Sequence, residues 1–200
     1  MIAPKIKFKY SWIYDKNWQE WAKVYGYNPK KDNWPSEKKI LNYIKEIKKL
    51  WDKEEKRVLE ELSKVTGLSW KEKEITCYVV GRCRPFSDPL TMGLRKNRDS
   101  FIDVFIHELI HQLFTQDSNM VKSKRAWQYI NKKYKKESLT TRIHIPLHAI
   151  HTHIFNKFYG EDRLNQEMTG VKNKDYVRSW RIVNQEDYKN IIQNFTSRIS

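Results

Sequence analysis

The chain has 200 residues, of which 39% are hydrophobic and 14% aromatic; this excludes a disordered chain, and only 6 Gly and 6 Pro argue against a turn-rich β protein. A net charge of +15 attracts polyanions, but most excess cations are lysines scattered on helix faces, so nucleic acid is not the expected primary partner. We therefore expect one α+β domain over residues 1–200 that is mainly helical.

The first part of the chain combines strands with helices. The segment IKFKYSWIY alternates and is rich in β-branched and aromatic residues, which predicts a short strand. Ser36 is a good N-cap, and apolar residues at helical spacing predict a helix over about 40–51 and a second over about 52–66, which stops at Gly67. Ile, Thr, Tyr and Val cluster in Glu74–Phe86, the best strand of the sequence.

The remainder is predicted to be helical after a short turn. Pro and Gly in SDPLTMGL indicate a turn and a short second strand, so a small antiparallel or mixed sheet would precede the helices. Asp99 or Ser100 can cap the first of these helices. The expected helices cover about Ser100–Thr115, Lys122–Lys136 and Ile145–Tyr159, and a final pair within DYVRSWRIVNQEDYKNIIQNF.

Cysteine content and hydropathy are the features of the sequence that bear on where in the cell the protein is expected. Cys77 and Cys83 are too few for a disulfide scaffold and are predicted to be reduced thiols. MIAPKIKFKY lacks the apolar core of a signal peptide, and no apolar run approaches 18 residues. We therefore expect a cytoplasmic protein without a membrane partner.

The segment FIDVFIHELIHQLF contains two histidines that are suited to metal binding. His107 and His111 are four residues apart, so a helix projects both imidazoles from one face, where they can hold one zinc ion. Glu108 is placed to take the proton of a metal-bound water. The helix is otherwise apolar on nearly all sides, and three buried ionisable side chains are costly unless they are paired or bind a metal.

A third ligand is expected from a second histidine cluster. All six histidines fall into two groups, and the second comprises His144, His148, His151 and His153. On a helix that begins near Pro146, the first three share a face and the fourth points elsewhere. His148 is favoured because apolar residues flank it, and His144 and His151 are the alternatives. A His144 that is not a ligand could instead hydrogen-bond a transition-state oxyanion.

FIHELIHQLF followed by HIPLHAIH resembles the zincin superfamily of zinc metallopeptidases, in particular small intracellular members with a histidine third ligand on a separate helix. The resemblance covers Glu74–Tyr159. It implies a catalytic Zn²⁺, a peptide or protein substrate, and a sheet before the active-site helix whose edge strand binds extended peptide. Asp117 is discounted as third ligand because Phe114 stands where metzincins have Gly, and Glu137 lies in a lysine-rich surface run.

Two other functions and three further residues complete the expectations. The zinc could be structural in a regulatory module, or it could stabilise a nucleic-acid-associated protein. Asp103 is expected one turn before His107, where it could accept a hydrogen bond from that ring. Tyr176 and Arg178 are chemically suited to contacts with a substrate. The sequence predicts neither the cleavage specificity nor the oligomeric state.

Overall fold

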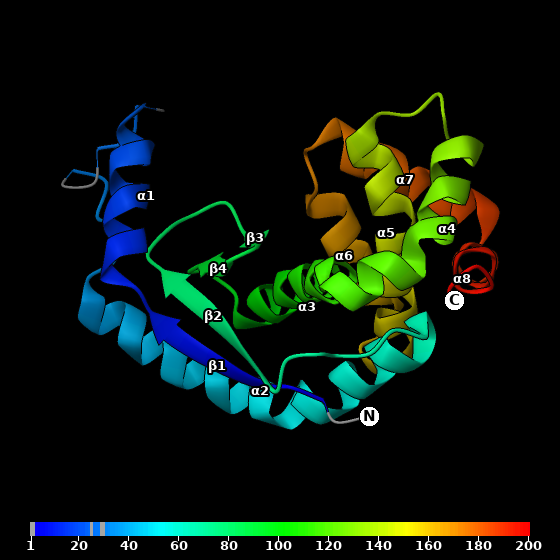
Figure 1. Ribbon diagram of the computed structural model, residues 1–200. Coiled ribbons are helices and arrows are strands. Elements are labelled where there is room, and N and C mark those ends of the chain that lie inside the picture. The colour runs from blue at the N-terminus through cyan, green and yellow to red at the C-terminus, as the bar shows by residue number, and fades with distance from the viewer. Residues whose placement is uncertain (1–2, 25, 29–30) are drawn as a thin grey trace. The chain divides into compact units, whose positions relative to one another are not determined.

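The computed structural model describes residues 3–24, 26–28 and 31–200 (Figure 1). These residues form a mixed α and β structure in which helices dominate and one small sheet is present. Contacts divide the chain into two compact units, each assembled from separate stretches of sequence. We call residues 57–71 and 109–200 the helical unit, and the described residues up to Lys56 together with 72–108 the sheet unit. A single domain over residues 1–200 stays a prediction.

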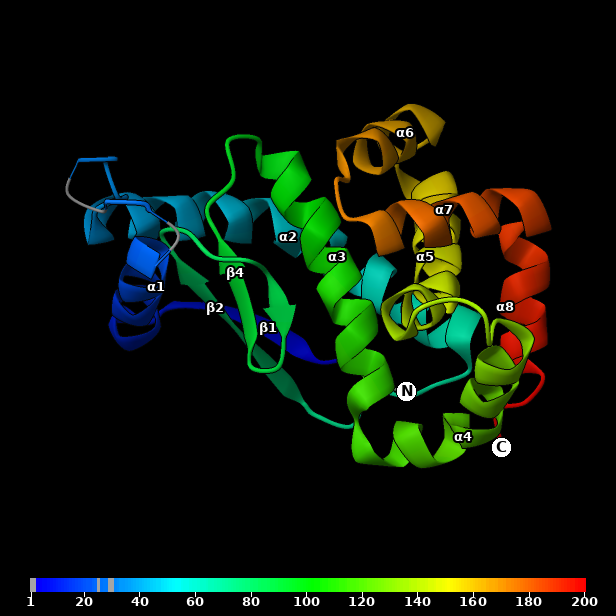
Figure 2. The ribbon, with the colours of Figure 1, turned by 90° about the horizontal axis from the view of Figure 1, so that it is seen from above.

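The sheet of the sheet unit is mixed, as the sequence allowed. Its strand order is β1-β2-β4-β3, and Figure 2 shows β1, β2 and β4 side by side. These three strands are parallel to one another, and β3 is antiparallel to β4. The strands are β1 (Lys5–Tyr10), β2 (Glu74–Val80), β3 (Phe86–Ser87) and β4 (Leu90–Gly93). Parallel neighbours need a long crossover, and between β1 and β2 the chain forms α1 (Trp12–Val24) and α2 (Glu37–Thr66).

Aromatic side chains form the core of the sheet unit. The ring of Phe105 lies 4.8 Å from that of Trp51 in an edge-to-face arrangement and 5.2 Å from that of Phe8, centroid to centroid. Tyr43 and Phe101 make a further edge-to-face pair at 5.6 Å. Such pairs add packing energy to the burial of large apolar areas, so α2, β1 and the start of the helix after β4 are held together.

A buried carboxylate joins three segments of the sheet unit. Asp15 on α1 is 3% exposed. It accepts hydrogen bonds from the backbone N–H of Gly81 at 2.6 Å, from Trp34 Nε1 at 3.1 Å and from Gln19 Nε2 at 3.0 Å. A Cβ at Gly81 would lie 2.4 Å from the Trp34 indole nitrogen, so only glycine fits at the end of β2.

One helix, α2, replaces the two that the sequence predicted between Ser36 and Gly67. The prediction was wrong because apolar residues at helical spacing continue through the expected junction, and no Pro or Gly interrupts them. Ile47, Trp51 and Val58 on this continuous face have no exposed surface. Gly67 ends the helix as expected, with a φ of 70° that a residue with a side chain adopts only with strain.

The helical unit is a bundle around one buried helix, α5. This helix packs against α7 and α8, and α6 and α4 contact the same group. Figure 1 shows α5 beside α7. The helices are α4 (Asp117–Lys133), α5 (Leu139–Phe158), α6 (Glu161–Gly170), α7 (Lys174–Glu186) and α8 (Tyr188–Thr196). The predicted C-terminal helix pair is confirmed by α7 and α8, whereas α6 was not predicted.

The start of α5 differs from the prediction by six residues. Ser138 caps the helix, and its Oγ accepts a hydrogen bond from the backbone N–H of Thr141 at 3.0 Å. Pro146, which the sequence predicted near the start of the helix, therefore lies inside it. His144 is consequently a helical residue, and His148 lies in the middle of the helix rather than in its first turn.

The helix that carries the histidine motif, α3 (Arg98–Thr115), begins two residues earlier than predicted. Asn97 accepts a hydrogen bond from the backbone N–H of Asp99 at 2.9 Å, which is the geometry of an N-cap, so neither Asp99 nor Ser100 caps the helix. The helix α4 begins five residues before the predicted Lys122. Buried Asn119 explains this, because its Nδ2 donates to the carbonyl of Leu113 at 2.7 Å and joins α4 to the end of α3.

Among the helices of the described residues, none combines the length and the apolar character that crossing a membrane requires.

Candidate metal centre

The histidine motif lies on one continuous stretch of α3. His107 and Glu108 are 8% and 7% exposed, and the residues between them and His111, Leu109 and Ile110, have no exposed surface. An α-helix brings residues i and i+4 to the same face, so the helix itself sets the place of His107 relative to His111. The predicted pairing of these two imidazoles on one face follows from this geometry.

Three histidines are close enough to share one ion. One ring nitrogen from each of His107, His111 and His144 lies within 4.8 Å of the other two. The ring centroids of His111 and His144 are 5.2 Å apart and the rings meet edge to face. Imidazole nitrogens are preferred ligands of zinc and of other first-row transition metals. This group could therefore hold a metal ion.

The sequence favoured His148 as the third member of this group, and the structure places its alternative His144 there. The earlier start of α5 is the reason, because it makes residue 144 part of the helix. His148 has a different environment. Its ring stacks on the indole of Trp180 with a centroid separation of 3.9 Å and an interplanar angle of 5°, and its Nδ1 lies 2.6 Å from Ser179 Oγ.

The tautomer of His144 suits metal binding. Its Nδ1 lies 2.7 Å from the backbone carbonyl oxygen of Thr140. A carbonyl oxygen only accepts hydrogen bonds, so Nδ1 must carry the proton and Nε2 presents its lone pair. Histidine ligands in metalloproteins commonly donate their second ring N–H in this way, which fixes the tautomer and the orientation of the ring.

The other two histidines have different surroundings, which are aromatic for His151 and polar for His153. His151 is fully buried, with its ring 4.4 Å from Phe155 and 5.8 Å from Trp180. His153 points away from the group, as predicted: its Nε2 lies 2.7 Å from Oε1 of Glu61 on α2. The burial of Glu61 tends to raise its pKa, but hydrogen bonds from His153 and Lys157 outweigh this effect and lower the pKa.

Burial keeps the histidines of the group in the state that binds metals. Burial, together with a smaller effect of the neighbouring His144, lowers the pKa of His111 to about 4. The pKa of His144 is also lowered by burial, although the hydrogen bond to Thr140 opposes this change. Both rings are therefore neutral at pH 7, and neutral imidazole is the form that coordinates a metal.

The pKa of Glu108 is raised, whereas those of the histidines are lowered, as expected for a buried acid. Burial raises the pKa of its carboxyl to about 7, and the positive charge of Arg95 opposes part of that rise. A carboxyl with a pKa near neutrality can both accept and release a proton at physiological pH. This property is suited to a general base.

Of the three other residues singled out in the sequence, Tyr176 contacts a histidine of the group, whereas Arg178 and Asp103 have other surroundings. Tyr176 on α7 packs on His144, with ring centroids 4.0 Å apart. Arg178 instead makes a bidentate ion pair with Glu137, with Nη2 at 2.6 Å and Nε at 3.0 Å from the carboxylate oxygens. Asp103 is 5% exposed on α3, one turn before His107. Nothing in the sequence indicated that Tyr176 would adjoin a histidine.

The two cysteines are protonated thiols. Burial raises the pKa of Cys77 well above its usual value, and it raises the pKa of Cys83 to about 12. Both are free, as predicted. A thiolate is the form that binds metals and attacks electrophiles, so neither side chain is prepared for that chemistry at neutral pH.

No family model matches the chain, and neither a curated protein nor a solved structure is significantly similar to it.

Proposed function

We propose that this chain is a zinc-dependent metallopeptidase with a zincin-like fold, in which His107, His111 and His144 bind Zn²⁺ and Glu108 is the general base. The observation that carries the proposal is the group of three imidazoles with a buried glutamate beside the first of them. Three protein ligands are typical of catalytic zinc sites, whereas structural sites usually have four.

The metal and the chain would have different tasks. When bound, zinc supplies a Lewis acid that lowers the pKa of water in the site and polarises the substrate carbonyl. Glu108 adjoins the first ligand and accepts the proton of the attacking water. The carbonyl of Thr140 holds the His144 ring in place through the bond to Nδ1, and the Tyr176 ring packs against it. The substrate would be a peptide or protein.

The order of elements supports a zincin-like fold. The mixed sheet precedes α3 in sequence, and the histidine motif lies on that helix. The short strand β3 has one neighbour, β4, and thus lies at the edge of the sheet. An edge strand has unpaired backbone groups that can bind an extended peptide.

Substitution of Glu108 by Gln tests the mechanism. The variant keeps the size of the side chain and all three ligands but has no basic carboxylate, so we expect stoichiometric zinc and at least about a hundredfold loss of hydrolysis. Zinc is measured by elemental analysis and hydrolysis with denatured casein as probe. Glu60→Gln is the control, because this exposed glutamate on α2 should retain full activity.

Two results would contradict the proposal in different ways. Retained hydrolysis in Glu108→Gln would remove this residue from the mechanism. Zinc-loaded wild-type protein without hydrolysis would favour the alternative, a structural zinc in a regulatory or nucleic-acid-associated protein.

A further inference from the structure

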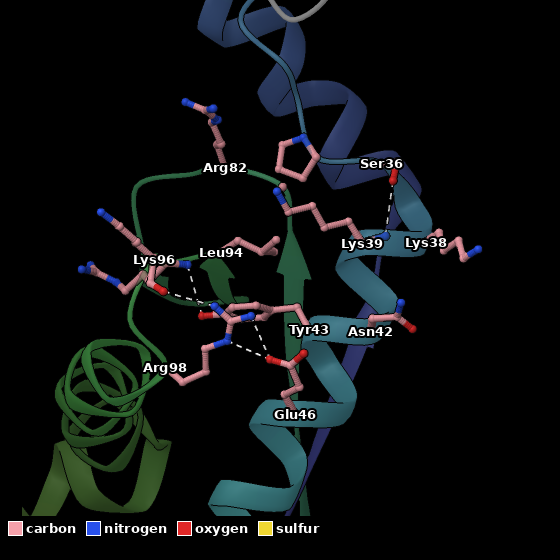
Figure 3. A pocket seen from close by; sticks show the side chains of 13 residues that line it. Ser36, Lys38, Lys39, Asn42, Tyr43, Glu46, Arg82, Leu94, Lys96 and Arg98 are labelled. Atoms are coloured by element: carbon pink, nitrogen blue, oxygen red, sulfur yellow. Dashed lines mark hydrogen bonds and ion pairs between the residues drawn. The ribbon is translucent and has the colours of Figure 1, made fainter.

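A basic pocket in the sheet unit has no part in the proposed hydrolysis. Its volume is about 800 Å³, and the start of α2, the end of β2 and the loop between β4 and α3 form its walls (Figure 3). Six of the residues that line it are cationic: Lys38, Lys39, Arg82, Arg95, Lys96 and Arg98. The pocket thus gathers positive charge from three separate stretches of the chain.

The charge of this pocket is almost uncompensated by its own lining. Glu46 is the only acid among the described residues that line it. Arg98 occupies that carboxylate, with Nε and Nη2 both 2.8 Å from Oε2. Five of the six cations are therefore not balanced by an acid of the pocket. A single carboxylate group would neutralise little of this charge, so a multiply charged anion is the matching ligand.

The first turn of α2 adds a second attraction for anions. Pro35, Ser36 and Lys39 line the pocket, and Ser36 Oγ accepts a hydrogen bond from the backbone N–H of Lys39 at 3.3 Å. The amino end of a helix has a partial positive charge and backbone N–H groups that bind phosphate. Figure 3 shows Lys39 extending from this turn toward Arg82, whereas Lys38 points away.

The inner wall of the pocket is held in place and is partly apolar. Tyr43 is 3% exposed, and its hydroxyl accepts a hydrogen bond from the backbone N–H of Arg95 at 3.1 Å. The guanidinium of Arg98 lies 4.6 Å from the centre of the Tyr43 ring. Leu94 and Pro35 add apolar surface. A ligand with a non-ionic part as well as charged groups fits such a lining.

We propose that this pocket binds a small ligand with two or more phosphate groups. The unbalanced cations and the helix terminus attract the phosphates, and the apolar surface of Pro35 and Leu94 contacts the rest of the molecule. The cations gather around one pocket of about 800 Å³, which favours a small molecule over a nucleic acid strand, because a strand needs an extended groove or stripe. This inference does not depend on the metal centre.

Calorimetric titration with inorganic tripolyphosphate at physiological ionic strength tests the proposal. The double variant Lys39→Glu/Lys96→Glu should bind at least about tenfold more weakly than the wild type, because two attractive charges become repulsive. The matched control is Lys49→Glu/Lys53→Glu, which changes the net charge equally at exposed positions of α2 outside the pocket. Its affinity should stay within about twofold of the wild type, since distant exposed charges are screened.

Two further titrations complete the test. One distinguishes a nucleotide from free polyphosphate as the ligand, and the other shows whether binding in the pocket is independent of the metal centre. Tighter binding of a nucleoside triphosphate than of tripolyphosphate would identify a nucleotide, whereas equal binding would identify free polyphosphate. Both should be unchanged in His107→Ala/His111→Ala, so that a failure of the zinc proposal is visible separately. Equal weakening in the two lysine double variants, or wild-type binding weaker than about 1 mM, would overturn the proposal.

Discussion

The ring of His144 is fixed by the carbonyl oxygen of Thr140, which lies 2.7 Å from its Nδ1. Because that carbonyl occupies the protonated nitrogen, Nε2 is the atom that can coordinate. We therefore expect His144→Ala to lower zinc affinity by more than the roughly 10–100-fold typical of a lost outer-shell partner. Competition with a chelating indicator measures the affinity.

The matched control for this substitution is His148→Ala, one turn further along α5. Its Nδ1 is bonded to Ser179 and its ring stacks on Trp180, so we expect the variant to keep one zinc per chain and to lose only stability. The assignment of the third ligand would be wrong if His148→Ala lost the metal and His144→Ala retained it.

Tyr176 is expected to act on the metal centre through its ring. Tyr176→Ala removes the ring that lies 4.0 Å from His144 and should lower zinc affinity severalfold, whereas Tyr176→Phe keeps the ring and should preserve it. Elemental analysis after dialysis compares the two variants. Equal zinc loss in both would show that the hydroxyl, and not the ring, supports the centre.

Arg178→Ala should have little effect on either zinc content or hydrolysis. Its guanidinium is engaged by Glu137 in a partly exposed ion pair, and such pairs contribute little to stability. We expect the unfolding midpoint to stay within about 2 °C of the wild type. Loss of hydrolysis at unchanged zinc content would instead support the contact with a substrate that the sequence suggested.

The sheet unit should depend strongly on Asp15. Asp15→Ala leaves the N–H groups of Gly81 and Trp34 without their acceptor, at a cost of about 3 kcal/mol in the free energy of unfolding. Asp15→Asn keeps one acceptor oxygen and should cost less. Urea unfolding followed by tryptophan fluorescence measures both variants. An Ala variant as stable as the wild type would show that water replaces the carboxylate.

Acid should destabilise the metal-free protein through its buried histidines. Burial lowers the pKa of His151 to about 3 in the folded state, against about 6.5 in the unfolded chain. Below pH 6.5 the unfolded state therefore binds a proton at this histidine and the folded state does not. The free energy of unfolding falls by about 1.4 kcal/mol per pH unit down to pH 3. At and above pH 6.5 this contribution to stability is fully present.

Urea unfolding between pH 7 and pH 4 measures this dependence. His151→Leu should reduce the slope of stability with pH, whatever its effect at pH 7. An unchanged slope would assign the acid sensitivity to other groups. His148, whose pKa burial also lowers, contributes in the same direction in both proteins.

Local patterns in the sequence predicted which helices and strands form better than they predicted the residues at which these elements begin and end. The apolar face around His107 and His111 is sufficient to indicate a buried helix with both imidazoles on one side. The spacing of His144 from His148 likewise indicated a shared face. The start of α5 was missed because Pro146 is typical of a first turn, whereas the effective cap, Ser138, lies among polar residues that resemble a loop.

Contacts between distant residues could not be predicted from one sequence. The stacking of His148 on Trp180 joins α5 to α7, which are far apart in the sequence. The basic pocket combines Lys39 with Arg82 and Lys96, which are brought together by the pairing of β2 with β4 and by the packing of α2. A count of charges along the chain suggested only scattered lysines.

The protonated state of both cysteines has a practical consequence for chemical labelling and metal counting. Alkylating and disulfide reagents react with thiolates, so the native protein should react slowly at Cys77 and Cys83, and rapid modification would report unfolding. For the same reason the thiols are weak competitors for zinc in the folded chain. Bound zinc that is lost in the histidine variants can therefore be attributed to imidazole ligands without mutating either cysteine.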